Sequence, residues 1–421
     1  MKNTTVCLIT LGCPKNLVDS ENLLARLGER SCVLTDSAED ADVLIVNTCG
    51  FLKSAVDESM DVIRKLCEKK KTGQKIIVYG CLVQRFGGKM PKIKGVDALF
   101  GVGCPESIVS TVCKTARVKS NCLPRLISTY PYAYLKISEG CENCCSYCLI
   151  PSIRGPLKSR TIRDLYDEAR RIKDMGIKEL ILVAQDTANY GKDRGEGTTL
   201  EKLLEKLAVL KFHWLRVMYL HPAHLNDRIL KTIADVPGIC RYLDIPLQHV
   251  HPEILEKMNR PVLDYGAIVD KIRDVIPGVR LRTTFITGFP GEKERHFRAL
   301  ADFIEEKEFD RLGVFAYSKE KGTPAFDMPG QVPEKMKKER ERILMELQQK
   351  ISHRKLKSLV GTEIEVLVEG RKGKYFTGRT EYDAPDIDGT VYIKTAGKLK
   401  TGDFRKVLIT SSGNYDLYAR F

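Results

Sequence analysis

Short apolar runs alternate with amphipathic stretches over the first 120 residues of the chain. The runs have the composition of buried strands and the stretches between them that of helices, with strands at 6–11, 43–47, 76–80 and 98–102 and helices at 17–27, 55–69 and 105–115. Strands that are apolar throughout are typical of a parallel sheet covered by helices on both faces. The pattern therefore predicts a doubly wound α/β domain over residues 1–120.

A second alternation of strand and helix patterns covers residues 133–330. Strand-like runs fall at 133–138, 179–186, 214–220, 241–246, 281–287 and 311–317, with helical stretches such as 162–173, 200–210 and 292–306 between them. Six β/α units predict a partial parallel (β/α)6 barrel, whose functional site lies on the loops at the carboxyl ends of the strands. The segment from about 118 to 132 loses periodicity and has the composition of a linker.

The C-terminal part of the chain changes character twice. Residues 333–357 form a charge-rich stretch with apolar residues at helical spacing, so we expect a connecting helix within 331–357. From residue 358 onward the pattern turns to period-two alternation, as at 363–368, with frequent glycines. A small antiparallel β-barrel of the oligonucleotide-binding kind is therefore expected over residues 358–421.

Charge and cysteine content narrow the class of protein. The chain has 69 Lys and Arg against 55 Asp and Glu, a formal net charge of +14. This balance favours acidic partners such as RNA, ribosomes or anionic cofactors, or reflects a well-solvated surface. No apolar stretch reaches the length of a membrane span. Fourteen cysteines without a signal-peptide pattern lead us to expect a cytoplasmic location, where thiols act as ligands or catalysts more often than as disulfides.

Four cysteines fall within eight positions after the strand-like run 133–137, namely Cys141, Cys144, Cys145 and Cys148. Read as CxxxCxxC, they offer three thiolates to one iron–sulfur cluster and leave Cys144 over. Biological [4Fe–4S] clusters normally take four cysteines, so a three-cysteine set leaves one iron open to a substrate. A structural zinc site would need a second ligand pair at set spacing, and none follows. The spacing therefore favours a cluster with a catalytic role.

Three further cysteines occupy equivalent places in the N-terminal domain. Cys13, Cys49 and Cys81 each follow a predicted strand, and each has a glycine within one position. Because the carboxyl ends of parallel strands meet at one edge of an open sheet, these thiols are expected to converge and to hold a second cluster. The alternative is that all three are core thiols, as we expect for Cys7, Cys32, Cys67 and Cys113.

Polar residues also gather where the later strands end. They include Gln185, Asp186 and His221, and the stretches 244–249 and 287–292. Such a rim suits a bound nucleoside and amino acid, although a lone histidine is more often a structural hydrogen-bond partner.

These features together resemble a known enzyme family. Tyr147 before the last cysteine of CxxxCxxC completes a pattern that resembles the radical S-adenosylmethionine signature. With Cys13, Cys49, Cys81 and a terminal barrel, the whole chain resembles a radical S-adenosylmethionine methylthiotransferase, with an N-terminal domain, a radical-SAM partial barrel and a TRAM domain.

Finer detail resembles one branch of that family. The stretch 12–16, Gly-Cys-Pro-Lys-Asn, is similar to the RimO branch, which modifies an aspartate of the twelfth small-subunit ribosomal protein. The tRNA-modifying MiaB branch tends to have Gln-Met at the third and fourth of these positions. The stretches 184–187, 219–222 and 378–380 also look RimO-like. Cys144 departs from the family pattern, in which a basic or polar residue is usual there.

The resemblance implies two [4Fe–4S] clusters, one that binds S-adenosylmethionine through its open iron and one that presents sulfur. The implied ligands are Cys141, Cys145 and Cys148 for the first cluster and Cys13, Cys49 and Cys81 for the second.

The resemblance also implies a reaction. Electron transfer to the sulfonium releases a 5′-deoxyadenosyl radical, which abstracts hydrogen from the β-carbon of the substrate aspartate, and a second S-adenosylmethionine supplies the methyl group. Tyr147 is expected to pack against the adenine, and Gln185 and Asp186 to contact the cofactor. A flavodoxin or ferredoxin would donate electrons, and the sulfur donor stays unknown.

Three alternatives stay open from the sequence: a methylthiotransferase acting on a tRNA adenosine, a noncatalytic iron–sulfur RNA-binding protein, and a zinc-binding structural protein. Residues 358–421 hold ten Lys and Arg against nine Asp and Glu, with Glu381, Asp383, Asp386 and Asp388 close together. A domain that grips tRNA should be strongly basic. This acidic stretch could instead meet a basic ribosomal protein, or form a solvated turn.

Overall fold

The computed structural model describes residues 3–90, 92–113, 125, 127–195, 197–395 and 397–421. The chain divides into two compact units. Unit 1 comprises Met1–Ser128, Glu139–Asn143 and Cys148–Lys158, and unit 2 comprises Thr129–Ser138, Cys144–Tyr147 and Ser159–Phe421. No described helix is both long and apolar enough to cross a membrane.

Unit 1 is built on a parallel five-stranded sheet in the order β2-β1-β3-β4-β5. Its strands are β1 (Thr5–Thr10), β2 (Val33–Leu34), β3 (Val43–Thr48), β4 (Lys75–Gly80) and β5 (Ala98–Phe100). Its helices are α1 (Pro14–Gly28), α2 (Lys53–Glu68), α3 (Cys81–Phe86), α4 (Pro105–Val112) and the short α5 (Ile150–Arg154), with a single 3-10 turn η1 (Gly87–Lys89).

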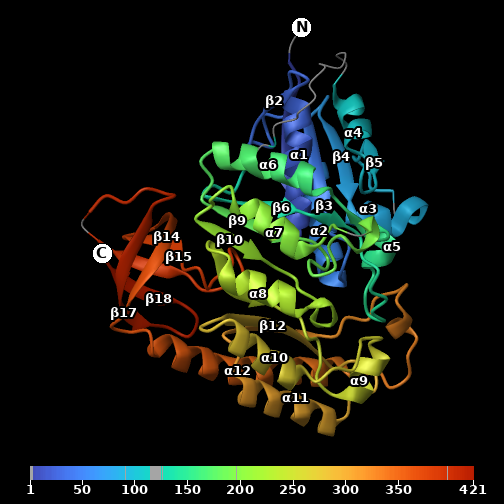
Figure 1. The fold of residues 1–421 in the computed structure, drawn as a ribbon. Helices are drawn as coiled ribbons and strands as arrows, with labels where there is room; N and C mark the ends of the chain where they lie inside the picture. Colours follow the sequence, from blue (N-terminus) through green and yellow to red (C-terminus); the bar gives the residue numbers. More distant parts are fainter. Residues whose placement is uncertain (1–2, 91, 114–124, 126, 196, 396) are drawn as a thin grey trace. The chain divides into compact units, whose positions relative to one another are not determined.

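Alternate residues of the central strands face opposite sides of this sheet. Ile45 and Ile77 pack in a core with Leu23 of α1 and Ile108 of α4. The strand residues next to them pack in a second core with residues of α2 and α3, such as Ile63. Helices therefore cover both faces (Figure 1), which confirms the predicted doubly wound architecture.

The four thiols predicted to be structural pack on these two cores. Cys7 and Cys113 are buried, and Cys32 and Cys67 are partly buried against the same clusters. Most of the predicted linker, residues 118–124 and 126, lies outside the described residues. Arg125 within it is buried, and its Nε donates to Oε2 of Glu21 at 2.8 Å.

Unit 2 begins with an open parallel sheet in the order β13-β12-β11-β10-β9-β6, the sequential order of a partial barrel. Its strands are β6 (Tyr132–Lys136), β9 (Glu179–Val183), β10 (Trp214–Val217), β11 (Ile239–Asp244), β12 (Arg280–Thr287) and β13 (Arg311–Ala316). The helices between them are α6 (Ile162–Asp174), α7 (Leu200–Ala208), α8 (Asp227–Asp235), α9 (Pro252–Lys257), α10 (Tyr265–Val275) and α11 (Glu294–Lys307). Helices α6, α7 and α8 lie in a row beside the strands (Figure 1), as in the predicted partial (β/α)6 barrel.

Short elements complete the connections of the chain around and within this barrel. They are β7 (Ser138–Glu139), β8 (Lys158–Ser159), η2 (Lys192–Arg194), η3 (Pro222–His224) and η4 (Pro324–Phe326).

The long helix α12 (Glu334–Lys357) leads from the partial barrel to a closed five-stranded barrel in the order β14-β15-β16-β18-β17. The strands are β14 (Glu363–Lys372), β15 (Tyr375–Arg379), β16 (Val391–Lys394), β17 (Phe404–Ser412) and β18 (Leu417–Arg420). Helix α12 packs on α11 and β13, and its Leu356 enters the core of the closed barrel. The predicted small C-terminal barrel is confirmed.

The acidic stretch of this small barrel is held by arginines of the partial barrel. Asp383 is 2% exposed and pairs with Arg311 of β13. The carboxylate of Asp388 accepts from the hydroxyl of Tyr242 at 2.7 Å and lies 3.5 Å from Nε of Arg282. Both sequence-based interpretations of this stretch, a docking surface for a basic protein and a solvated turn, are therefore wrong for Asp383 and Asp388.

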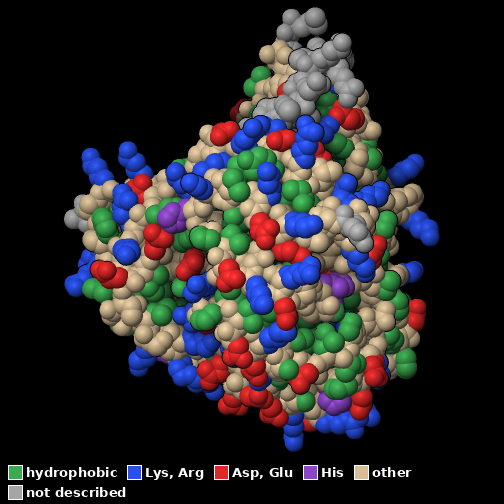
Figure 2. Space-filling model, in the orientation of Figure 1, with side chains coloured by type: hydrophobic (Ala, Val, Ile, Leu, Met, Phe, Trp, Pro, Cys, Tyr) green, Lys and Arg blue, Asp and Glu red, His purple; other side chains and the backbone are tan. Residues whose placement is uncertain are grey.

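Charge on the visible surface is mixed. Figure 2 shows Lys and Arg side chains interleaved with Asp and Glu over the described residues of the face drawn, with Lys and Arg side chains projecting around the small C-terminal barrel. On the face drawn, the Lys and Arg side chains are therefore not gathered in one patch.

Candidate functional site

Cys13, Cys49 and Cys81 leave three neighbouring parallel strands of unit 1 at the same edge of the sheet. Cys13 caps the N-terminus of α1 after β1, Cys49 follows β3 directly, and Cys81 is the first residue of α3 after β4. Strands β1, β3 and β4 are adjacent in the sheet. The fold therefore assembles this set from three distant stretches of sequence, at the edge where open α/β sheets carry their ligands.

Two glycines let these segments approach closely. A Cβ placed on Gly12 would lie 2.7 Å from Cβ and 3.2 Å from Sγ of Cys49. A Cβ on Gly50 would lie 2.7 Å from the carbonyl oxygen of Cys81. Gly12 also has φ = +91°, which residues with a side chain rarely adopt. The backbone segments that carry Cys13, Cys49 and Cys81 therefore lie close together at this edge of the sheet.

Two of the three thiols at this edge, Cys49 and Cys81, have pKa values above the ordinary cysteine value. Burial raises the pKa of Cys81 to about 11, with Arg154 opposing the shift, and Cys13 and Cys49 raise it further. Burial is also the main cause of the raised pKa of Cys49. Metal binding replaces protons on cysteine, so three thiols at one edge of the sheet fit a metal or an iron–sulfur cluster.

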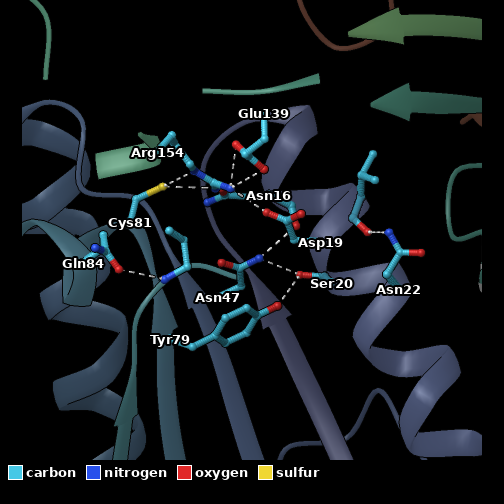
Figure 3. Close-up of polar contacts among 12 residues, drawn as sticks. Asn16, Asp19, Ser20, Asn22, Asn47, Tyr79, Cys81, Gln84, Glu139 and Arg154 are labelled. Carbon is cyan, nitrogen blue, oxygen red and sulfur yellow. Dashed lines mark hydrogen bonds and ion pairs between the residues drawn. The ribbon is translucent and has the colours of Figure 1, made fainter. Parts of the chain in front are cut away.

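Arg154 of α5 is the cation of this site (Figure 3). Its Nε donates to Sγ of Cys81 at 3.2 Å, and its Nη2 donates to Oδ1 of Asn16 at 2.6 Å. Its Nη1 donates to Asp19 at 2.8 Å and to Glu139 at 3.3 Å. Burial disfavours its charge, but Asp19, Cys81 and Glu139 outweigh burial and raise the pKa of Arg154 above its ordinary value. The site thus holds a permanent positive charge beside a cysteine sulfur.

Asn16 links this arginine to the rim of the sheet. It is fully buried, and its Nδ2 donates to the carbonyl oxygens of Leu11 at 2.9 Å and Thr48 at 3.2 Å. Below it, Nδ2 of Asn47 donates to the backbone oxygen of Asn16 at 2.8 Å. The side chain of Asn16 therefore ties the segment before Cys13 to the end of β3.

The CxxxCxxC loop supplies backbone donors to two of its sulfurs. Within unit 1, the N–H of Asn143 donates to Sγ of Cys141 and the N–H of Ile150 donates to Sγ of Cys148, both at 3.4 Å. The N–H of Cys141 itself donates to the carbonyl of Gly155 at 3.1 Å. Such N–H···S contacts stabilise thiolates and tune iron–sulfur clusters, so Cys141 and Cys148 fit the predicted role.

The middle of the loop belongs to unit 2. Nη1 of Arg260 lies 4.0 Å from Sγ of Cys145 and donates to the hydroxyl of Tyr147 at 3.4 Å. Tyr147 packs against a buried cluster that includes Met258 and Phe289. Cys144 is exposed, in keeping with its exclusion from the predicted ligand set.

Gln185 and Asp186 lie just beyond the carboxyl end of β9. Asp186 is buried and accepts from the backbone N–H of His221 at 3.3 Å and from Nδ1 of His224 at 2.6 Å. Burial, followed by Arg260, lowers the pKa of His221 to about 3, so its ring is neutral. Among the described residues, Oε1 of Gln185 and Oε1 of Gln248 are buried without a hydrogen-bond partner. These orphan acceptors fit a rim that receives a polar ligand such as S-adenosylmethionine.

The stretch 287–292 is held by an ion pair rather than left open. Oε1 of Glu292 accepts from the N–H of Gly288 at 2.9 Å and from Arg340 at 2.6 Å. Arg340, on α12, therefore fixes the end of β12.

Arg154, Asn16 and Arg260 were not among the residues predicted from sequence. A signal for Asn16 existed, because it ends the stretch 12–16 that carries the family resemblance. Arg154 lies six positions after Cys148 and Arg260 far from any cysteine, so neither could be assigned without the fold.

Comparison with protein families divides the chain into three parts. Residues 5–101 match the uncharacterized protein family UPF0004, residues 135–304 the radical SAM superfamily, and residues 360–421 the TRAM domain. Membership of the radical SAM superfamily implies an iron–sulfur cluster and S-adenosylmethionine as cofactors.

Solved structures share the fold at low sequence identity. The radical S-adenosylmethionine methyltransferase TsrM from Kitasatospora setae, with cobalamin and a [4Fe–4S] cluster bound, is similar with a TM-score of 0.55 at 14% identity, over 81% of this chain and 85% of that one. The cobalamin-dependent radical enzyme OxsB is similar with a TM-score of 0.51 at 12% identity, over 83% of this chain and 56% of that one.

Curated relatives match over nearly the full length. The ribosomal protein uS12 methylthiotransferase RimO of Desulforamulus reducens is 44% identical over 98% of both chains. Those of Pelotomaculum thermopropionicum and Clostridioides difficile are 46% and 42% identical, over 97% and 98% of this chain and 97% of each relative. The chain therefore belongs to the RimO family of methylthiotransferases, within the radical SAM superfamily.

Proposed function

We propose that this protein is a radical S-adenosylmethionine methylthiotransferase that adds a methylthio group to the β-carbon of an aspartate in ribosomal protein uS12. Full-length identity of 40–46% to curated relatives with this activity supports the substrate. The observation that carries the chemistry is the convergence of Cys13, Cys49 and Cys81 at one rim, apart in sequence from CxxxCxxC. One three-cysteine set would suffice for radical formation, and a second is needed where sulfur must be delivered.

The two sets are proposed to hold two [4Fe–4S] clusters. Cys141, Cys145 and Cys148 would hold the cluster that binds S-adenosylmethionine, and the three rim cysteines of unit 1 would hold the cluster that presents sulfur. When bound, the first cluster and S-adenosylmethionine supply a reductively generated radical, and the second supplies the sulfur. Three protein ligands each leave one iron open for these roles.

The protein's own residues near the loop and the rim would orient the bound cofactor. Tyr147, held by Arg260 and by packing on Phe289, presents a fixed aromatic surface beside the loop. Oε1 of Gln185 is a buried acceptor without a hydrogen-bond partner among the described residues. Asp186 is held by hydrogen bonds from His221 and His224. The low pKa of His221, about 3, keeps its ring neutral, so this histidine would add no further positive charge to the rim.

An electron donor of the flavodoxin or ferredoxin type is proposed as the partner that reduces the first cluster. The cytoplasmic location inferred from the sequence stays a prediction. So do the domain limits 1–120, 133–330 with the connecting helix at 331–357, and 358–421.

Mass spectrometry of uS12 from cells with and without this gene tests the function. A mass increase matching one methylthio group on a single aspartate, present only with the gene, is the expected result. Incubating the reconstituted enzyme with uS12 and with tRNA in parallel separates the alternatives. Methylthiolation of adenosine in tRNA with unmodified uS12 would overturn the proposed substrate, while absence of 5′-deoxyadenosine would overturn the radical chemistry.

A further inference from the structure

The short helix α5 connects the end of the CxxxCxxC loop to the second cysteine set. It begins two residues after Cys148 and ends with Arg154, whose Nε donates to Sγ of Cys81 at 3.2 Å. We propose that Arg154 is a positioning residue of the N-terminal cysteine site, which orients the sulfur of Cys81 and sets the reduction potential of the group bound there. The proposal rests on the proposed function, because it takes Cys81 as a ligand of a cluster.

The guanidinium of Arg154 is fixed on every side that its donors face. Beyond the contact with Cys81, it donates to Asn16 at 2.6 Å, to Asp19 at 2.8 Å and to Glu139 at 3.3 Å (Figure 3). Its side chain is only 3% exposed. Because a guanidinium is a rigid planar fork, fixing Nη1 and Nη2 also fixes the direction of Nε–H. That N–H therefore points at the cysteine sulfur as a consequence of three other contacts.

The partners of Arg154 come from separated parts of unit 1. Asn16 and Asp19 lie on α1, directly after Cys13, and Glu139 lies just before Cys141. The arginine thus joins the segments that carry ligands of both proposed clusters. A purely structural ion pair requires only a carboxylate partner. Arg154 in addition donates a hydrogen bond to the sulfur of a cysteine.

Apolar packing places α5 at this position. Leu149 and Ile153 form a small buried cluster with Cys81 and the partly buried Val102, and α5 packs on α3. Leu149 is the residue after Cys148. The single helical turn of α5 therefore separates Cys148, a proposed ligand of the first cluster, from Arg154, which contacts the sulfur of Cys81.

The positive charge of Arg154 should raise the reduction potential of a cluster bound through Cys81. A cluster with three thiolates is anionic, and a hydrogen bond from a buried cation to one of its sulfurs stabilises the reduced, more negative state. Removing Arg154 should therefore lower the reduction potential of the N-terminal cluster. It should also leave Cys81 without its charged donor and weaken cluster binding, since loss of such supporting groups typically costs about 10- to 100-fold in metal affinity or activity.

The test uses the full chain with Cys141, Cys145 and Cys148 all replaced by Ala, so that iron bound after anaerobic reconstitution reports the N-terminal site. Arg154→Gln and Arg154→Lys are compared in this background with Arg26→Gln, a matched loss of one arginine from α1 whose partner is Glu106 rather than a cysteine. The readouts are iron and sulfide per chain, the electron paramagnetic resonance spectrum of the reduced protein, and its midpoint potential.

Arg154→Gln is expected to lower the midpoint potential and to change the spectrum. Arg154→Lys should give a smaller shift, because lysine keeps the positive charge but lacks the planar guanidinium. Arg26→Gln should have the same potential and spectrum as the parent. A parent that binds iron and an Arg154→Gln variant with the same potential and spectrum would overturn this inference alone. A parent that binds no iron would overturn the second cluster of the proposed function, and this inference with it. If Arg154→Gln does not fold, as judged by circular dichroism, the midpoint potential of Arg154→Lys is used instead. A lowered potential supports the inference, and a potential equal to that of the parent overturns it.

Discussion

The cysteine loop at 141–148 and the cysteine rim of the N-terminal sheet offer the same number of proposed thiolate ligands but are built in opposite ways. In the loop, eight consecutive positions carry the set, and backbone N–H groups of the neighbouring residues donate to Cys141 and Cys148. In the rim, Cys13, Cys49 and Cys81 follow three different strands, glycines let the segments approach closely, and Arg154 donates to Cys81.

This difference has a physical consequence. A contiguous loop keeps its cysteines within eight positions through chain connectivity, although its middle residues also contact the distant Arg260. A converging site depends on the register of β1, β3 and β4 and on close backbone contacts, so it should be more sensitive to substitutions that are not ligands.

The largest effect is expected from replacing one ligand of the loop. Cys145→Ala should abolish 5′-deoxyadenosine formation and methylthiolation, by at least about 100-fold, because a ligand is lost outright rather than a supporting group. Liquid chromatography with mass detection of both products measures this. The neighbouring Cys144→Ala serves as the control, since Cys144 is exposed, and should retain both activities. Equal loss in the two variants would contradict the ligand assignment.

The next effect separates the two sites. Replacing Cys13, Cys49 and Cys81 together by Ala should abolish methylthiolation while 5′-deoxyadenosine formation continues, because only the rim is proposed to deliver sulfur. Iron bound per chain should fall by roughly half if each set holds one [4Fe–4S] cluster. Sulfur insertion into uS12 by this variant would refute the second cluster. Zinc in place of iron in the unaltered protein would favour a structural metal site instead.

A substitution at Gly12 should test how strongly the rim depends on close backbone packing, because it leaves all six proposed cysteine ligands unchanged. Gly12→Ala places a Cβ 2.7 Å from Cys49 at φ = +91°, a conformation that costs about 1–2 kcal/mol for residues with a side chain. We expect loss of iron from the rim and reduced methylthiolation, measured by metal analysis and by product mass.

Gly28→Ala is the matched control for that change. Gly28 ends α1 with no atom within 4 Å of an added Cβ. Its iron content and its free energy of unfolding should equal or slightly exceed those of the parent. If Gly12→Ala kept full iron, the rim would be less dependent on close packing than the structure indicates.

The smallest effect on product formation is expected in the acidic stretch of the C-terminal barrel, where substitutions should change the stability of the protein instead. Asp383→Ala leaves Arg311 buried without its partner and should lower the free energy of unfolding by about 3–5 kcal/mol. Asp386→Ala removes an exposed carboxylate that accepts from Tyr132, and should cost less than about 1 kcal/mol. Urea unfolding of the full chain compares the two, and similar losses would show that burial does not strengthen the Asp383–Arg311 pair.

Most of the fold could be predicted from the sequence, and the ligand assignments of the site stay predictions. The strand and helix order followed from hydrophobic periodicity, because buried parallel strands are apolar on both faces, as Ile45 and Leu44 of β3 illustrate. The sequence predicted strands through 184–186 and 218–220, but the structure ends β9 at Val183 and β10 at Val217. The polar residues Gln185 and Asp186 leave the sheet after β9, and after β10 the positive φ of Tyr219, +63°, breaks the extended backbone. The helices α3 and α5 were not predicted, since five or six residues carry too little periodicity.

The sequence by itself determined the loop at 141–148 and placed three more cysteines at strand ends, because strand periodicity and short-range spacing are local properties. Only the tertiary structure decided which residues support them. Arg154 reaches Cys81 across a sequence separation of 73 residues, and Asp383 reaches Arg311 across 72. Such contacts depend on how helices and barrels pack, so a charged residue in the sequence does not reveal whether it will face water or a buried partner.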